Sequence, residues 1–358
     1  MMEPMAIKCC PNDSGRTFEV RIFNNVPNKL DFSVLGNKTR CLCVVDNNVV
    51  NHFEKLQTGG FHDLNIKPLY LEIGAKSLDA VIKIWEAMVI SKPEFVIAFG
   101  GGTTCDLSGF AASTYKRGIP ILLFPTTLLA MTDVAISGKT GVDFANIKNS
   151  VGSIHYPHLC VSIIDFLHTL DLIEFRSALS EMVKVSVTSD VEFFEHLETL
   201  QSINSRHEEL ASLIETSCRL KAAIVEGPPN IRLHSLYGHV IGQAIECITP
   251  NRSRHGDCVA IGLNIEGFIA TRLGLWSEAE WLRQQRLLRN LGLPTSIPVG
   301  ISVDQLLDQA RKDKHAGVND VKLILPQKIG GVFSENGNAL TTVPIEVVKQ
   351  LLLEFLSL

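Results

Sequence analysis

The sequence predicts two domains: an α/β domain with a doubly wound parallel sheet over residues 1–165, and a mainly α-helical domain over 166–358. Apolar runs of strand length alternate with amphipathic segments in the first half, whereas after about residue 166 the apolar residues recur at helical spacing. Length points the same way, because 358 residues exceed what a single hydrophobic core usually supports.

The strand-like runs of the first half are short, apolar and bounded by turn residues. We expect buried parallel strands within TRCLCVVD (39–46), KPEFVIAFGGG (92–102) and IPILLFPTTLLA (119–130). A last run of this kind, LCVSIID, lies within 156–171 and places the domain boundary there.

The helical predictions begin where these runs end. Apolar residues follow a helical period in EFRSALSEMVKVSV (174–187), HEELASLIETSCRLKAAIV (207–225) and EAEWLRQQRLLRNLGL (278–293). Few strand-like runs remain in this half, so we expect it to be mainly helical.

Composition narrows the class of protein. Apolar residues make up 46% of the chain and charged residues 20%, which favours a folded globular protein over a disordered one. A formal net charge of -5 provides no basic surface for nucleic acid or acidic lipid. The N-terminus lacks the pattern of a signal peptide and no apolar stretch is long enough for a membrane span. We therefore expect a cytoplasmic protein without nucleic-acid or membrane partners.

A glycine-rich turn follows the predicted strand FVIAF. Gly100, Gly101 and Gly102 come directly after it, and a helix-like segment starts at about Asp106. Glycines at such a turn let backbone N–H groups approach a pyrophosphate that a side chain would exclude. This pattern is typical of a Rossmann-like dinucleotide site, although Cys105 stands where the third glycine of G-x-G-x-x-G belongs. The alternative is a tight connection without a ligand.

Polar residues also follow the neighbouring strands. Asp46 is placed like a ribose-binding acid at the carboxyl end of a strand, or forms an ordinary turn with Asn47. Thr126 and Thr127 either donate to a phosphate or cap the next helix.

Three segments each offer one metal ligand: SALSEMVK with Glu181, SLYGHVIGQAIE with His239 and SRHGDC with His255. Two neutral imidazoles and a carboxylate leave open positions on a zinc-like ion, which suits a catalytic site. The alternative is a solvated helix acid and two ordinary histidines among the 11 of the chain.

Cationic and polar residues gather in the middle of the chain, where they are suited to holding an anion and to tuning proton transfer. A series of solvated loop charges is the alternative. The group consists of Lys116, Arg117, Asp133, Lys139, Lys148, Asn149 and Lys184.

Read in order, GGGTTCDLSGF, YKRGIP, PTTLLAMTD, SGKTGV, SEMVK, YGHVIG and HGD resemble the motifs of dehydroquinate synthase and its sugar-phosphate-cyclase relatives, from about Phe95 to Gly330. The resemblance implies that NAD and one divalent metal, zinc or cobalt, act on a phosphorylated sugar in a cleft between the two domains. It also implies a homodimer, in which Arg117 reaches a substrate phosphate across the interface.

The resemblance also assigns roles to individual residues. Metal ligands are Glu181, His239 and His255. Catalytic residues are Lys139, Lys184, Asp133 and Lys221. Substrate-binding residues are Arg117, Lys148, Asn149, Arg232, Leu236, Gln243 and Lys314. Cofactor-binding residues are Asp46, Glu72, Lys76, Gly100, Gly101, Gly102, Asp106, Thr126 and Thr127.

Two positions depart from the pattern of the dehydroquinate-forming members, which read Asn-x-Gly-His-x-x-x-His in the metal segment. Leu236 replaces the asparagine and Gln243 replaces the second histidine. Gln243 still forms hydrogen bonds but does not gain a proton near neutral pH, and Leu236 has no polar group. Arg232 instead favours a dehydroquinate-forming enzyme, because an arginine at this position suits a substrate carboxylate.

The implied reaction converts a phosphorylated ketose to a carbocycle by transient oxidation with NAD, β-elimination of phosphate, re-reduction and intramolecular aldol closure. We favour a C7 substrate such as sedoheptulose 7-phosphate. A 3-dehydroquinate synthase of the shikimate pathway and a glucose 6-phosphate cyclase similar to 2-deoxy-scyllo-inosose synthase stay open. So do a metal-dependent polyol dehydrogenase, which would produce NADH, and an inactive binding or regulatory protein.

Overall fold

The computed structural model describes residues 4–358 apart from 12–14, 16, 62–63, 146, 201, 250–252 and 314. The chain forms two compact units, 1–170 with 205–222, and 171–204 with 223–358. The limits expected from the sequence, 1–165 and 166–358, stay a prediction. The two compact units differ from these limits because most of helix α7 (Leu210–Glu226) belongs to the first unit.

Seven strands of the first unit form one sheet in the order β1-β2-β9-β6-β5-β3-β4. β1 and β2 pair antiparallel, and the pairs from β2 across to β4 are parallel. The strands predicted from the sequence are confirmed as β3, β5, β6 and β9. Bounds are Met5–Cys9 (β1), Phe18–Phe23 (β2), Arg40–Asp46 (β3), Asn65–Leu71 (β4), Phe95–Gly100 (β5), Ile121–Pro125 (β6) and Leu159–Ile163 (β9).

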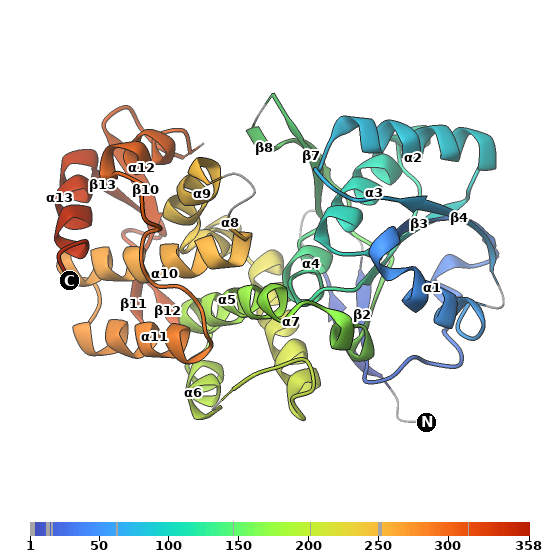
Figure 1. Cartoon of the computed structure of the whole chain (residues 1–358), viewed down its shortest axis with the longest axis horizontal. Coiled ribbons are helices and arrows are strands. Elements are labelled where there is room, and N and C mark those ends of the chain that lie inside the picture. Colours follow the sequence, from blue (N-terminus) through green and yellow to red (C-terminus); the bar gives the residue numbers. More distant parts are fainter. Residues whose placement is uncertain are drawn as a thin grey trace. The chain divides into compact units, whose positions relative to one another are not determined.

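Helices cover both faces of this sheet, which explains why its central strands are continuously apolar. Alternate residues of β3, such as Cys43 and Val45, share one buried cluster with Phe53 of α1 (Val50–Gln57). The opposite face packs against α2 (Leu78–Ser91) and α3 (Gly102–Thr114). Figure 1 shows α1 on one side of β3, and α2 and α3 on the other.

The strand order reverses between β3 and β5. From β3 the chain passes to the edge strand β4, where Pro68 is tolerated because an edge strand need not donate every N–H. It then returns through α2 to β5 on the other side of β3. In open α/β sheets, ligands bind where the carboxyl ends of two such strands diverge. Asp46 and Gly100 are the last residues of these two strands.

Besides most of α7, the rest of the first unit consists of a hairpin and short helical turns. β7 (Lys139–Phe144) pairs antiparallel with β8 (Ile147–Ile154). The short turns are η1 (Ser33–Leu35), η2 (Asn47–Val49), η3 (Tyr115–Arg117), the π-helix η4 (Ala130–Val134), α4 (Ala135–Ser137) and η5 (Ile164–Thr169).

The second unit is mainly helical, as predicted, with two small strand pairs, β10–β13 and β11–β12. Helices are α5 (Leu172–Ser189), α6 (Val191–Thr199), α8 (Pro229–Arg232), η6 (Leu233–Leu236), α9 (His239–Ile248), α10 (His255–Arg272), α11 (Glu278–Asn290), α12 (Val303–Ala310) and α13 (Ile345–Phe355). Strands are β10 (Asp320–Ile324), β11 (Pro326–Lys328), β12 (Gly331–Val332) and β13 (Leu340–Pro344). Within the described part of the chain, no helix is long and apolar enough to cross a membrane.

Helix α10 is the centre of the second unit. Nearly all its residues between 256 and 270 are buried, as expected of a helix surrounded by α5, α9 and α11. α9 and α10 approach closely because glycines face each other. A Cβ on Gly262 would lie 1.9 Å from the carbonyl oxygen of Gly238, and one on Gly242 would lie 2.8 Å from that of Cys258.

Candidate metal and cofactor sites

Three helices of the second unit bring the predicted metal ligands together. Glu181 lies in the middle of α5, His239 is the first residue of α9 and His255 is the first residue of α10. Their ligand atoms all lie within 4.8 Å of one another. Oε1 of Glu181 is 3.8 Å from Nε2 of His239 and 4.0 Å from Nε2 of His255.

Both imidazoles are oriented through their other ring nitrogen. Nδ1–H of His239 donates to the carbonyl oxygen of Tyr237 at 3.2 Å, and Nδ1–H of His255 donates to Oε2 of Glu246 at 3.1 Å. These bonds select the tautomer in which each Nε2 carries a lone pair directed toward Glu181. Glu246 was not predicted from the sequence, because only the packing of α9 on α10 brings it to His255.

The residues present fit a divalent cation. Glu181 is 2% exposed, and its Oε2 pairs with the ammonium group of Lys184. Its Oε1, which lies within 4.0 Å of Nε2 of both histidines, has no hydrogen-bond partner among the described residues. A buried carboxylate with unused lone pairs is costly unless a cation satisfies it. Two imidazole nitrogens and one oxygen form a donor set of the kind that zinc and cobalt accept.

The surroundings of His255 make it a basic imidazole. Burial lowers the pKa of His255, but the hydrogen bond that its Nδ1–H donates to Glu246 and the charges of Glu246 and Glu181 outweigh it, so the pKa lies above its usual value. Lys184, one turn after Glu181, is 1% exposed and pairs with that carboxylate. The structure thus places the predicted catalytic lysine beside the predicted ligands.

Three of the predicted nucleotide-binding residues, Asp46, Gly100 and Thr126, meet near the strand-order reversal of the first unit. A Cβ on Gly100 would lie 2.4 Å from Oγ1 of Thr104 and 3.0 Å from Cβ of Asp46, so only glycine fits there. The N–H of Thr126 donates to the carbonyl oxygen of Gly100 at 2.9 Å. These contacts join the ends of β3, β5 and β6 at one edge.

Helix α3 begins at Gly102, earlier than the start near Asp106 expected from the sequence, and Gly101 is its N-cap. The first N–H groups of a helix lack partners within it and attract anions. The glycines therefore place the start of α3 at the same edge, where a pyrophosphate would be accommodated.

Two predicted cofactor contacts make local bonds in the structure. Oγ1 of Thr127 accepts from the N–H of Ala130 at 3.2 Å, which matches the helix-capping alternative. Oδ1 of Asp46 accepts from the N–H of Asn48 at 2.9 Å and so stabilises the turn after β3.

Glu72, a third predicted cofactor contact, follows β4 and lines a cavity of about 700 Å³ with Lys83 of α2.

Lys76 connects two predicted groups of residues. Its Nζ pairs with Asp106 of α3 and donates to Oδ1 of Asn149 at 2.8 Å. Burial raises the pKa of Asp106, whereas Lys76 lowers it, and the pKa lies above its usual value. Lys76 and Asp106, both predicted to bind the cofactor, are thereby linked to Asn149, which is predicted to bind the substrate, within the first unit.

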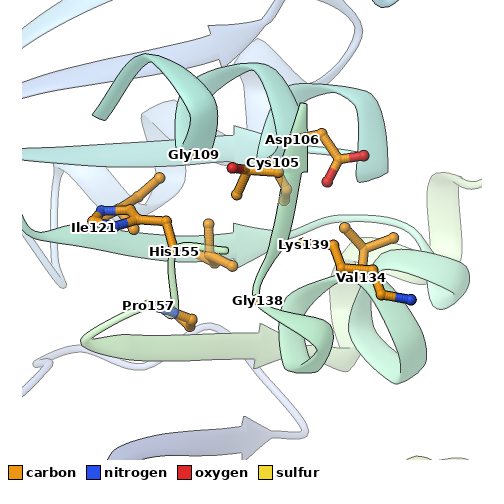
Figure 2. A pocket seen from close by; sticks show the side chains of 11 residues that line it. Cys105, Asp106, Gly109, Ile121, Val134, Gly138, Lys139, His155 and Pro157 are labelled. Atoms are coloured by element: carbon orange, nitrogen blue, oxygen red, sulfur yellow. The ribbon is translucent and has the colours of Figure 1, made fainter. Parts of the chain in front are cut away.

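A small pocket lies between α3 and the start of β7. Figure 2 shows the side chains of Asp106 and Lys139 on one side of it and His155 on the other. Lys139 begins β7, while Lys148 and Asn149 lie on the paired strand β8. The hairpin therefore positions three predicted substrate and catalytic residues.

Asp133 and Lys221 form an ion pair within the first unit. Asp133 lies on the π-helix η4, and Lys221 lies on α7 with its side chain 4% exposed. Sγ of Cys218, three residues earlier on α7, donates to the carbonyl oxygen of Met131 at 3.3 Å. π-Helical turns are frequent at functional sites. Two residues predicted to be catalytic are thus direct partners.

Arg117 has an unusual backbone conformation. Its φ is 69° and that of Lys116 is 51°, which is the left-handed region that non-glycine residues rarely adopt. Asn149, with φ 51°, shares this feature. Such strained residues concentrate at functional sites, because surrounding structure must maintain them.

The remaining predicted substrate residues lie in the second unit. Nε of Arg232 donates to the carbonyl oxygen of Gly227 at 3.0 Å. Leu236 ends η6, and the exposed Gln243 follows His239 by four residues on α9, so it lies on the same helix face. Lys314 lies outside the described residues.

These features define a class of protein: a parallel-sheet α/β domain with a glycine-rich turn at its strand-order reversal, followed by a helical domain with a Glu-His-His cluster. Comparison with known proteins identifies the family. A family model described as 3-dehydroquinate synthase N-terminal matches residues 72–177, and one described as 3-dehydroquinate synthase C-terminal matches 178–316. The chain belongs to the dehydroquinate-synthase-like sugar-phosphate cyclases.

Individual relatives agree with this assignment. A 3-dehydroquinate synthase from Nostoc punctiforme is 36% identical over 288 residues, which cover 77% of this chain and 78% of that protein. 2-Epi-5-epi-valiolone synthase from Streptomyces hygroscopicus, solved with NAD+ and Zn2+ bound, is 27% identical with a TM-score of 0.78 and covers 95% of this chain and 97% of that one. A 2-deoxy-scyllo-inosose synthase complexed with carbaglucose-6-phosphate, NAD+ and Co2+ shares the fold at 22% identity, with a TM-score of 0.86 and coverage of 98% and 99%.

Proposed function

We propose that this protein is an NAD- and metal-dependent sugar-phosphate cyclase. The observation that carries the proposal is the cluster of Glu181, His239 and His255, whose ligand atoms lie within 4.8 Å of one another in a member of this family. NAD+ with Zn2+ or Co2+ in the two solved neighbours supports the same cofactors here. When bound, NAD supplies transient hydride acceptance and the metal polarises oxygen atoms of the sugar.

The remaining roles follow the charges and hydrogen-bonding groups of the residues. Lys139, Asn149 and Arg117 bind the substrate phosphate, assisted by Lys148. Lys184 is buried against Glu181 and Lys221 against Asp133, so each pair has a fixed geometry in which to orient a hydroxyl group or relay a proton.

The proposed substrate is a C7 ketose phosphate such as sedoheptulose 7-phosphate, which would lose phosphate by β-elimination and close by an aldol step without net redox change. Leu236 and Gln243 support this choice, because they replace the asparagine and histidine of dehydroquinate-forming members. Dehydroquinate formation is the second candidate. It is supported by relatives named 3-dehydroquinate synthase and by Arg232, which suits a substrate carboxylate.

The test is a phosphate-release assay with sedoheptulose 7-phosphate, 3-deoxy-arabino-heptulosonate 7-phosphate and glucose 6-phosphate. We expect release from the first substrate, dependence on NAD and no accumulation of NADH. Activity on the second substrate alone would replace our choice with dehydroquinate synthase. Stoichiometric NADH would instead identify a polyol dehydrogenase.

The metal assignment has its own test. His239→Ala removes one of three ligands and is expected to abolish retention of Zn2+ after dialysis, measured by elemental analysis. His196→Ala, on α6, is the matched control and should retain Zn2+ like the unmodified protein. Equal Zn2+ content in His239→Ala would refute the assignment.

We also propose a cytoplasmic homodimer. Arg117 is exposed on the turn after α3, where it is accessible to a second copy of the chain. Light scattering at increasing protein concentration is expected to give the mass of two chains, and a constant single-chain mass would contradict the proposal.

A further inference from the structure

The helix that carries His239 is capped from a different helix. The first N–H groups of α9 have no partners within the helix, and most helices satisfy one of them with a Ser, Thr, Asp or Asn at the N-cap. Here the N-cap is Gly238, which has no side chain. Glu266 of α10 takes that place: Oε2 accepts from the N–H of Gly238 at 2.7 Å and Oε1 from the N–H of Ile241 at 3.1 Å.

Close packing explains why the cap is not local. Gly238 has φ 77°, and a Cβ there would lie 2.8 Å from the side chain of Leu263 and 2.9 Å from its backbone nitrogen. A side chain at this N-cap is therefore excluded on both conformational and steric grounds. The acceptor has to come from α10, and Glu266 lies where the two backbones meet.

Burying the carboxyl group of Glu266 at its position costs free energy of folding. Its side chain is 0% exposed, inside the apolar stretch around Phe268 of α10. Burial raises the pKa of Glu266 to about 8, against backbone N–H donors that lower it. An apolar side chain would pack there without the desolvation cost, so the carboxyl group needs a compensating role, which its two hydrogen bonds provide.

The residue before Gly238 is tied to the same helix. The hydroxyl of Tyr237 donates to the carbonyl oxygen of Leu263 at 3.0 Å and lies 2.8 Å from Oε1 of Gln284, while its carbonyl oxygen accepts from Nδ1 of His239. α10 also begins with His255. One helix thus supplies one imidazole and holds the backbone that presents the other.

We propose that Glu266 is a positioning residue for the metal site: by capping α9 it holds the imidazole of His239 opposite His255 and Glu181. This inference rests on the proposed metal site. Without the two acceptor oxygens the first turn of α9 would open more often, and metal binding would have to reorder it. Ligand-orienting groups outside the coordination sphere typically contribute about 10–100-fold to metal affinity.

The experiment is a Co2+ titration of the purified apo protein, followed by the d–d absorption of the bound ion. Glu266→Met keeps the length of the side chain and removes both acceptors, so we expect about 10–100-fold weaker binding and an altered spectrum. Glu266→Gln retains one acceptor oxygen and is expected to recover part of the affinity.

A control on the same helix separates positioning from general loosening. Asn264 is equally buried, but its Nδ2 donates to the carbonyl oxygen of Thr295 and it accepts from Trp281, away from α9. Asn264→Leu is expected to leave the Co2+ affinity and spectrum unchanged. Unchanged binding in Glu266→Met, or an equal loss in Asn264→Leu, would overturn the inference.

Results that refute the proposed metal site differ from those that refute only the role of Glu266. Unmodified protein that binds no Co2+, or binding that persists in His239→Ala, overturns the proposed site and the inference with it. Amide hydrogen exchange on unmodified protein covers the case in which Glu266→Met does not fold. The amides of Gly238 and Ile241 should be protected, and Co2+ should slow their exchange further. Exchange at the rate of exposed loop amides would also overturn the inference.

Discussion

The two histidines of the metal cluster differ in what holds them. His239 donates to a neutral carbonyl oxygen, whereas His255 donates to the carboxylate of Glu246. A carboxylate stabilises the imidazolium form, so proton and metal compete more strongly at His255. The ligand set alone does not reveal this asymmetry, which arises from the residues behind it.

The first prediction concerns the pH dependence of metal binding. A raised pKa at His255 means that, as pH falls, this imidazole is protonated earlier than an ordinary histidine with a pKa of about 6.5. Zn2+ affinity should therefore decline already at a pH above that value. NMR titration of the apo protein should show the raised pKa, and Glu246→Gln should lower it. Identical titration of His255 in both proteins would contradict this origin of the shift.

The ion pair between Lys221 and Asp133 in the first unit leads to a second prediction. Lys221→Met leaves the Asp133 carboxylate without its partner, which we expect to cost about 2–3 kcal/mol, because removing one member of a buried pair costs about 3–5 and Asp133 is partly exposed. Urea unfolding measures the loss. Arg219→Met breaks the exposed pair with Glu215 on the same helix and should cost below about 0.5 kcal/mol. Equal losses would show that Lys221 is not held in a buried pair.

At the scale of elements, the contact between α9 and α10 positions both histidines. Glycines at Gly238, Gly242 and Gly262 let the two backbones touch, and Glu266 bonds across the contact. α5 also packs on α10 and contributes Glu181. The metal cluster therefore depends on how three helices pack, more than on any one helix.

Gly262→Ala tests this contact. The new methyl group would lie 1.9 Å from the carbonyl oxygen of Gly238, and a backbone atom does not give way as a side chain does. We expect a loss of about 3 kcal/mol, at the upper end of overpacking effects, measured by urea unfolding. Gly74→Ala is the control, because among the described residues no atom beyond its two chain neighbours lies within 4 Å of its added Cβ. Similar stability of both variants would show that α9 and α10 separate easily.

At the scale of the whole molecule, all three candidate metal ligands belong to the second unit. The chain returns to the first unit through residues 205–222, so the two units are not consecutive pieces of sequence. Metal binding should nevertheless stabilise mainly the unit that holds the ligands.

Calorimetry with Zn2+ and with a chelator tests this expectation. At a free metal concentration of about 100 times Kd, binding contributes about 2.7 kcal/mol, which raises the Tm of the affected transition by roughly 5–10 °C. His239→Ala should show no such rise. A rise confined to the transition of the first unit would place the metal elsewhere.

Much of the fold was predictable because its signals are local. Continuous apolar runs identify β3, β5 and β6, and the turn chemistry of Gly100 and Gly101 follows directly from the sequence. The start of α3 was predicted at Asp106 instead of Gly102, because glycine is an unusual first helical residue. The capping bond of Thr127 was one of two open alternatives, and the structure shows it.

By itself, the sequence determined the two kinds of domain, the glycine-rich turn and, through the order of its motifs, the family and the three candidate ligands. Only the tertiary structure decided what holds those ligands in place. Glu246 and Glu266 are single acids in helices, and nothing within a few residues of them points to His255 or to the start of α9. Their roles arise from contacts between helices, which depend on packing and therefore leave no local signature in the sequence.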